Sequence, residues 1–292
     1  MRPICHLFML MLLLSACCIT SCTNHESQEV LNRAELLMEA HPDSALTILK
    51  GIKKSELVSK KEQARYALLM SMALDKNYID TTSFEVLQPA LDYYLENGNS
   101  DERLRTYYYQ GCIFLNKGDR DNALSSFAKS LDNTPGSNDS LCMARALVAQ
   151  ARIYIDFYDL DSYTTNYLKA ADIYHLKGNQ EMEFDCLLNA LNGAIILQDK
   201  HRADSLINLC NLFESLDDRQ HQILYGYRLS YTLNFGTDDE LINLIDNQQS
   251  IPVHVPCHTV LKPHKKSNCC QRAIVETPFQ TIPIFLHIFA PG

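Results

Sequence analysis

The feature that most constrains the fold of this chain is a forty-residue spacing of small, aromatic and turn-forming residues. Residues 104–135, LRTYYYQGCIFLNKGDRDNALSSFAKSLDNTP, contain two apolar helical patterns separated by Gly118-Asp119 and ended by Pro135. Proline ends a helix because it has no N–H and clashes with the carbonyl one turn back. Related sets recur at steps of forty residues, at Leu147, Ala151, Tyr154, Asp159, Tyr163, Tyr167 and Ala170, at Leu187, Ala194, Asp199, Ala203, Ile207 and Cys210, and at Ala67, Met70, Leu74, Ser83, Leu87 and Ala90.

These four units predict an all-α chain of helix hairpins. One hairpin cannot bury its own apolar face, so about three must stack to be stable. A constant register over four units satisfies that requirement. An isolated amphipathic hairpin at 104–135 is the alternative interpretation of this one stretch.

Residues 104–135 resemble one tetratricopeptide repeat (TPR). The resemblance implies a bulky Tyr107, a small Gly111 at the helix crossing that faces Ala123, Phe114 in the pocket beneath, Phe127 against the next hairpin, and Pro135 as the stop, with Ala151, Tyr154 and Ala203 as packing residues of later repeats. Gln110 and Ser130 depart from the pattern, which usually has an apolar residue and alanine there. The forty-residue step exceeds the usual length of about 34. The fold class expected is therefore an all-α, right-handed α-solenoid of antiparallel helix hairpins with an irregular C-terminal tail.

Turn and capping residues place the individual helices. A first, atypical hairpin is expected at Glu26–Ala40 and Asp43–Lys53 with Asp43 as N-cap, and a second at Lys60–Asp75 and Ser83–Asn97. Later helices are expected at 101–117, 120–134, 140–157, 160–177, 179–198, 200–216, 218–235 and from 238 to 247. Helix stops paired with new caps lie at Gly98-Asn99, Gly118-Asp119, Gly136-Ser137 and Gly178-Asn179.

Residues 1–22 are typical of a lipoprotein-type signal peptide. Arg2 precedes an apolar run from Leu7 to Ile19, which is too short for a membrane-spanning helix. Two stretches resemble a lipobox, ending at Cys17 and Cys22, and Cys22 is preferred because polar residues follow it at once. A plain cleaved signal is the alternative. A diacyl anchor would supply the two chains that stable membrane attachment requires.

The segment 23–247 forms the expected TPR-like repeat domain, and the character of the chain changes near Ser250. Six of the ten prolines lie in residues 251–292, where Glu276 is the only acidic residue. This proline density excludes helix. A shifted reading frame attached to a truncated repeat array is the first hypothesis for this Pro/His/Cys-rich tail, and a genuine linker or binding tail is the second.

Charge and motifs exclude several classes of function. Residues 23–250 contain 34 acidic and 21 basic side chains, so this segment repels nucleic-acid phosphates. No catalytic motif is found, and no cofactor is expected. One His/Cys cluster has spacings that match no common zinc site, so no metal site is assigned to it. Its members are His254, Cys257, His258, His264, Cys269 and Cys270. Cys112, Cys142, Cys186 and Cys210 are expected to be small core residues.

The first helices of successive tetratricopeptide repeats line a concave groove, and the resemblance places Arg65, Arg105 and Arg145 at equivalent positions along it. Tyr108, Arg152, Asn189 and Asn192 are expected to face the same surface. Arginine can hold carboxylates bidentately. The Lys/Asn set of the chaperone-tail carboxylate clamp is absent. Arginines that only solvate the helix starts are the alternative.

The arrangement as a whole resembles exported tetratricopeptide proteins of Bacteroidota-type bacteria, through the lipobox-like start, LLMEAHPDSALTIL at 36–49 and ARYALLMSMALDKNYID at 64–80. The resemblance implies a non-catalytic scaffold, anchored at the cell envelope and facing the periplasm or the cell surface, that binds a protein or peptide. The alternative is the truncated sensor part of a membrane-spanning signalling or transcription-regulatory protein. Nothing in the sequence supports an enzyme.

Overall fold

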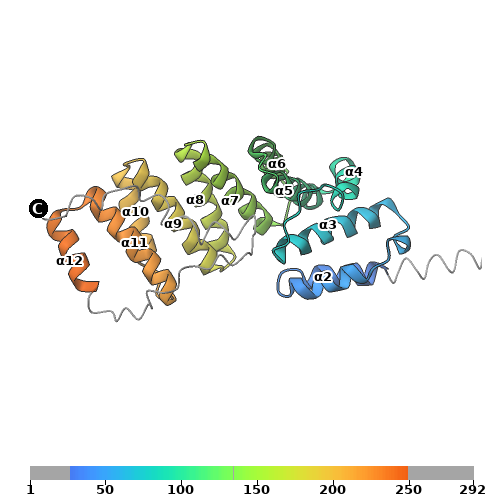
Figure 1. Cartoon of the computed structure of the whole chain (residues 1–292), viewed down its shortest axis with the longest axis horizontal. Coiled ribbons are helices and arrows are strands. Elements are labelled where there is room, and N and C mark those ends of the chain that lie inside the picture. Colours follow the sequence, from blue (N-terminus) through green and yellow to red (C-terminus); the bar gives the residue numbers. More distant parts are fainter. Residues whose placement is uncertain (1–26, 134, 249–292) are drawn as a thin grey trace, which may run out of the picture. The chain divides into compact units, whose positions relative to one another are not determined.

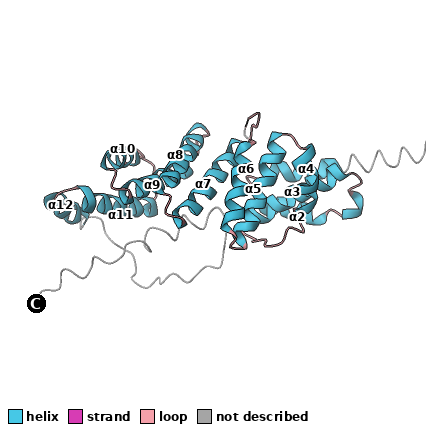
Figure 2. Cartoon of the chain, turned by 90° about the horizontal axis from the view of Figure 1, so that it is seen from above, coloured by secondary structure: helices cyan, strands magenta, loops and turns pink. Residues whose placement is uncertain are grey.

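The computed structural model describes residues 27–133 and 135–248, and this part of the chain is helical throughout, with no strand (Figures 1 and 2). The all-α prediction is therefore confirmed for these residues. Contacts divide the chain into two compact units, Met1–Ser137 and Asn138–Gly292.

The first unit contains a helix over residues 27–37 followed by five further α-helices and one short 3-10 helix. The elements are α2 (Pro42–Gly51), η1 (Lys54–Glu56), α3 (Lys60–Lys76), α4 (Gln88–Asn97), α5 (Ser100–Asn116) and α6 (Arg120–Asp132). α2 packs on α3, α3 on α4, and α5 on α6, so neighbours in sequence are neighbours in space (Figure 1). Leu31, Leu69, Tyr94, Leu104 and Phe127 form the centre of its core.

The second unit contains α7 (Ser140–Asp156), α8 (Leu160–Leu176), α9 (Gln180–Ile196), α10 (Lys200–Cys210), α11 (Asp218–Phe235) and α12 (Asp238–Gln248). From α7 to α10 each helix packs on the next, and α11 also packs on α9 (Figure 1). Its core is rich in alanine, including Ala146, Ala149 and Ala203, with Ile153, Phe184 and Leu191 as the large fully buried side chains. Small residues allow the helices to approach closely.

A three-residue joint connects several of the helices. After α8, Lys177 is the C-cap, Gly178 adopts φ +68°, and Asn179 begins the next helix as its N-cap. The Asn179 N–H donates to the Tyr174 carbonyl at 2.9 Å, while its side-chain oxygen accepts from the Met182 N–H at 3.2 Å. One residue thus closes a Schellman motif and caps the following helix.

The same joint recurs at Gly118-Asp119, Tyr158-Asp159 and Gln198-Asp199. A seventeen-residue helix such as α7, α8 or α9 and a three-residue joint add up to twenty residues. Two such steps give the forty-residue spacing of the sequence. The predicted pairing of stop and cap is confirmed at Gly98-Asn99, Gly118-Asp119 and Gly178-Asn179. It was wrong at Gly136-Ser137, because Asn133 is the C-cap of α6 and Asp139 is the N-cap of α7.

Three further predicted boundaries were wrong. Asp43 is not an N-cap, because α2 begins at Pro42 and Asp43 lies in its first turn. Proline is favoured at a first helical position, where its missing N–H has no partner to lose. α4 begins at Gln88 rather than Ser83, again beside a proline at its start. α10 ends at Cys210 rather than 216, and Phe213 beyond it packs on Phe184 with ring centroids 5.1 Å apart.

Two glycines mark close helix crossings. A Cβ on Gly111 would lie 2.5 Å from the Phe127 ring, and one on Gly193 would lie 2.1 Å from the Thr164 hydroxyl oxygen. Gly111 is therefore the small residue of the α5–α6 crossing, as expected, but Phe127 is what lies against it. Gly193 is the small residue at the α8–α9 crossing. The forty-residue spacing did not predict this role for Gly193.

Candidate binding site

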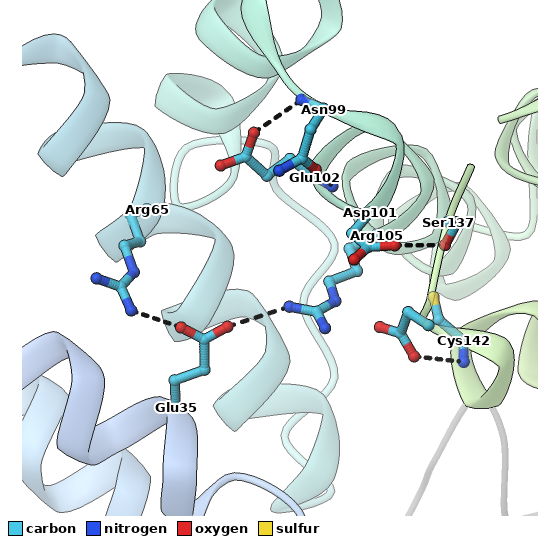
Figure 3. Close-up of polar contacts among 9 residues, drawn as sticks. Glu35, Arg65, Asn99, Asp101, Glu102, Arg105, Ser137 and Cys142 are labelled. Carbon is cyan, nitrogen blue, oxygen red and sulfur yellow. Dashed lines mark hydrogen bonds and ion pairs between the residues drawn. The ribbon is translucent and has the colours of Figure 1, made fainter. Parts of the chain in front are cut away.

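Two of the predicted groove arginines converge on one carboxylate (Figure 3). Arg65 on α3 approaches Glu35 at 2.6 Å between Nη2 and Oε2, and Arg105 on α5 approaches it at 3.2 Å between Nη1 and Oε1. α3 and α5 pack on each other, so a forty-residue spacing becomes one shared site. Glu35 comes from the helix over 27–37, which sequence reasoning did not connect to this site.

Neighbouring polar side chains hold the site in place. Arg65 Nη1 donates to Gln28 Oε1 at 3.0 Å, and Gln28 Nε2 donates to Glu62 Oε1 at 3.1 Å. Glu62 also accepts from Ser27 and completes a capping box with Ser59 at the start of α3. Burial by itself raises the pKa of Glu62, but the hydrogen bonds from Ser59, Gln28 and Ser27 outweigh burial and hold that pKa below its usual value. A charged Glu62 thereby fixes Gln28 against Arg65.

A cavity of about 410 Å³ opens over the arginines. Its charged lining consists of Lys61, Arg65, Arg105, Glu35, Asp101 and Glu102. Asp101 accepts a hydrogen bond from Ser137, and Glu102 caps α5 at Asn99 (Figure 3). The side chains of Arg65 and Arg105 are 24% and 25% exposed, and that of Glu35 is 37% exposed. All three side chains therefore remain in contact with water at the edge of the cavity.

The floor of this cavity is aromatic. Tyr94 on α4 lines it and is 1% exposed. Burial, followed by the charge of Glu102, raises the pKa of Tyr94 well above its usual value, so the phenol stays neutral. A neutral tyrosine and two guanidinium groups thus line the same cavity.

Tyr108 was predicted to face the groove, and the structure contradicts this. Its side chain is 0% exposed and lies 5.8 Å from the Phe127 ring between centroids. Tyr107, predicted as the buried bulky residue, is only half-buried. The repeat pattern alone does not tell which of three consecutive tyrosines points into the core. A small rotation of the helix about its axis would let any one of them take the buried position.

The remaining predicted groove residues lie in the second unit. Arg145 is half-buried on α7, and its relation to the first unit stays a prediction. Asn189 accepts from the Tyr163 hydroxyl at 3.1 Å and donates to the Asp185 carbonyl at 2.8 Å. Asn192 hydrogen-bonds Tyr163, and Arg152 hydrogen-bonds Tyr167. These side chains form a polar cluster around two tyrosine rings whose centroids are 4.9 Å apart.

The predicted packing residues divide into two groups. Gly111, Ala123, Phe127, Ala151 and Ala203 are buried. Tyr107, Phe114 and Tyr154 are half-buried, and Pro135 is exposed. Phe114 meets Phe84 edge-on with centroids 5.0 Å apart, which places it against the segment before α4.

The four cysteines in the described part of the chain lie in the cores of the two units. Cys112, Cys142, Cys186 and Cys210 are buried and form no disulfide with one another, as expected for small core residues. Burial raises the pKa of the Cys210 thiol to about 12, and it raises that of Cys186 further. Such thiols are poor nucleophiles because the thiolate is the reactive form.

Within residues 27–133 and 135–248, no group of three or more His, Cys, Asp or Glu side chains is arranged to hold a metal ion. No helix in those ranges combines the length and hydrophobicity needed to cross a membrane. The predicted signal with Cys17 and Cys22, and the tail with its His/Cys cluster, lie outside the described residues.

Comparisons with protein-family models, with curated proteins and with solved structures find no match to this chain. The interpretation of the site therefore rests on its own residues and geometry.

Proposed function

We propose that this chain is a non-catalytic scaffold that binds a protein or peptide, built as a right-handed α-solenoid of TPR-like hairpins and anchored by lipid at a bacterial cell envelope. The observation that carries the binding role is the convergence of Arg65 and Arg105 on a single exchangeable carboxylate over an open cavity. The forty-residue helical period supports the architecture. The lipobox-like sequence ending at Cys22, or at Cys17, supports the anchor.

The proposed binding step is an exchange of carboxylates. A guanidinium group presents several N–H donors in a fixed plane and pairs with carboxylates through two parallel hydrogen bonds. Glu35 occupies one donor region of each arginine in the free chain. An Asp, Glu or C-terminal carboxylate of a partner would take the place of Glu35, and apolar partner atoms would lie near Leu68, Leu69 and Tyr94.

The test uses immobilised ten-residue peptides that differ only in Asp and Glu against Asn and Gln. We expect the acidic peptides to bind, and Arg65→Ala or Arg105→Ala to weaken binding by about tenfold, since charged hydrogen bonds contribute about 1.5–3 kcal/mol. Glu35→Gln should strengthen binding because it removes the internal competitor. The readout is the dissociation constant from fluorescence anisotropy of the best peptide in solution.

Arg33→Ala is the matched control. Arg33 is an exposed arginine on the same helix as Glu35, outside the cavity lining, so its removal changes the net charge equally. Circular dichroism should show unchanged helicity for all variants. Equal binding of the amide peptides, or equal binding by the Arg65 and Arg105 variants, would refute the assignment of this cavity.

A further inference from the structure

A second, larger cavity lies wholly within the second unit. Its volume is about 920 Å³, and it is formed by the C-terminal half of α8, the N-terminal half of α9 and the connection from α10 to α11. None of the predicted groove residues lines it. It is therefore independent of the Arg65–Arg105 site in both position and composition.

One part of this cavity is apolar. Leu187 forms the floor at 7% exposed, while Leu209 and Leu212 are 45% and 73% exposed at its margin. α10 ends at Cys210, and Phe213 packs on Phe184, so this connection brings Leu212 and its neighbours to the cavity. Two exposed leucines around a hollow form an apolar surface that a partner's side chain would remove from water.

The other part is acidic. Five carboxylates line the cavity, from Asp172, Glu181, Glu183, Glu214 and Asp217. His175, which lies 2.9 Å from Glu183 between Nδ1 and Oε1, is the only basic side chain among the lining residues that the structure describes.

The five carboxylates are not equally engaged. Asp217 caps α11 through the Gln220 N–H at 2.7 Å, and Glu183 is held by His175. In the described part of the chain, Asp172, Glu181 and Glu214 form no ion pair. The cavity therefore combines an apolar floor with three carboxylates that no cation of the described chain neutralises.

The buried carboxyl group of Asp185 lies close to two of the acidic side chains that line the cavity. Asp185 lies one turn beyond Glu181 on α9 and is 9% exposed. Burial and then the charge of Glu181, with Asp217 adding to it, raise the pKa of Asp185 to about 6, against the opposing effect of Arg219 and Arg152. Negative charge thus dominates around this cavity.

We propose that this cavity docks a cationic amphipathic peptide segment, with a bulky apolar side chain over Leu187, Leu209 and Leu212 and flanking Lys or Arg side chains paired with Glu181 and Glu214. Such a segment matches both halves of the lining, because apolar burial supplies affinity and opposite charge supplies attraction and orientation. A second copy of this chain fits poorly, since its formal net charge is −9 and like charges repel.

The probe is a fluorescein-labelled eighteen-residue peptide of Leu and Lys at helical spacing, titrated against the full chain and followed by anisotropy. We expect binding that Leu212→Ser weakens at least tenfold, and that the pair Glu181→Gln and Glu214→Gln weakens at least tenfold. Both sites are exposed, so neither change should unfold the protein. The same peptide with Glu in place of Lys should not bind. Raising the salt concentration from low to high should weaken binding, because the paired charges are screened.

Matched controls separate docking from general attraction. Glu96→Gln with Asp132→Asn removes the same charge from exposed positions in the first unit, and Leu176→Ser replaces a leucine that is 82% exposed outside the cavity. Both controls should bind the probe as the parent does. Equal weakening by the charge control would overturn the proposal, and so would unchanged binding by Leu212→Ser. A parent chain that sediments as a dimer and becomes monomeric with Leu212→Ser would assign the cavity to a second copy, which also overturns it.

Because this cavity shares no residue with the Arg65–Arg105 site, its failure would leave the proposed function standing. The reverse also holds: loss of acidic-peptide binding at the arginines would not affect the cationic probe.

Discussion

Asp185 is expected to destabilise the folded protein because its carboxyl group is buried, and this burial is not evident from the sequence. In sequence it is an ordinary acidic residue near a helix start, with Glu181 and Glu183 in the first turn of that helix. In the structure it is 9% exposed, and burial together with Glu181 and Asp217 raises its pKa from 3.8 to about 6. The burial of Asp185, which is the largest cause, and the approach of Asp217 both arise only from the tertiary arrangement.

Asp185→Asn is predicted to stabilise the protein at neutral pH. A carboxyl group with a raised folded-state pKa binds its proton more tightly when folded, so stability falls as pH rises from about 4 to about 6, and the full penalty remains above that range. The shift from 3.8 to about 6 corresponds to up to about 3 kcal/mol. Urea unfolding should therefore show a gain for Asp185→Asn at pH 8 that vanishes near pH 4.

Glu96→Gln, an exposed position on α4, is the control and should change the free energy of unfolding little at either pH. A gain for Asp185→Asn that is the same at pH 8 and pH 4 would show that packing, rather than ionisation, causes it.

Glu35 makes the same point for the binding site. The pairing of Arg65 with Arg105 was predictable, because a forty-residue repeat places equivalent residues on equivalent helices. Their shared carboxylate was not, since no periodicity relates Glu35 to either arginine. Tyr108 was assigned to the wrong face because neighbouring residues 107 to 109 are all tyrosine.

At the scale of the element, the joints between helices decide the period. Helix starts were predicted within one residue for α5 through α11, because capping is a local interaction between a side chain and backbone N–H groups two or three residues away. Helix ends without a glycine, such as that of α10, were less predictable, since tertiary packing of Phe213 ends the helix there.

Some of the joints between helices place a residue other than glycine in the left-handed backbone conformation. Gly118 and Gly178 adopt φ of +80° and +68°, yet the equivalent Tyr158 adopts +58° and is 86% exposed. The left-handed conformation costs a residue with a Cβ about 1–2 kcal/mol, and glycine avoids that cost. Tyr158→Gly should therefore raise the free energy of unfolding by about 1 kcal/mol, measured by chemical denaturation, with part of the gain offset by the entropy of the unfolded chain.

Phe157→Gly is the neighbouring control. Phe157 is 50% exposed and has φ −93°, so glycine relieves no strain there and should lower stability, through the entropy of the unfolded chain and the loss of the half-buried ring. Equal effects of the two substitutions would show that the Tyr158 backbone is unstrained.

At the scale of the whole molecule, contacts are local in sequence. In each unit, helices in extensive contact are neighbours or next neighbours along the chain, such as α8 with α9 or α9 with α11. In repeat architectures with this property, the free energy of unfolding is approximately a sum of contributions from single repeats and from the interfaces between adjacent repeats. A destabilising substitution therefore affects mainly its own repeat and the adjacent ones. The expected all-α class follows from the sequence period. How many helices a destabilising substitution affects depends instead on how each pair of helices packs.

Substitutions of Gly111 and Gly193, which lie where two helices cross, test whether destabilisation stays local. Gly193→Ala would bring a Cβ within 2.1 Å of Thr164 Oγ1, and Gly111→Ala would bring one within 2.5 Å of the Phe127 ring. Thr164 and Phe127 are both 0% exposed, so neither side chain can swing into solvent, and each overpacked crossing should cost about 1–3 kcal/mol.

Hydrogen exchange followed by mass spectrometry should show protection lost first in α8 and α9 for Gly193→Ala, and in α5 and α6 for Gly111→Ala. The loss should decline with distance along the chain, because each helix is stabilised by its immediate neighbours. Gly226→Ala, where an added Cβ meets nothing within 4 Å, should cause no loss of protection, because alanine favours the helix that Gly226 lies in. A uniform loss over residues 27–248 from either lesion would mean that the chain unfolds as one cooperative block, and the account of locally summed stability would be wrong.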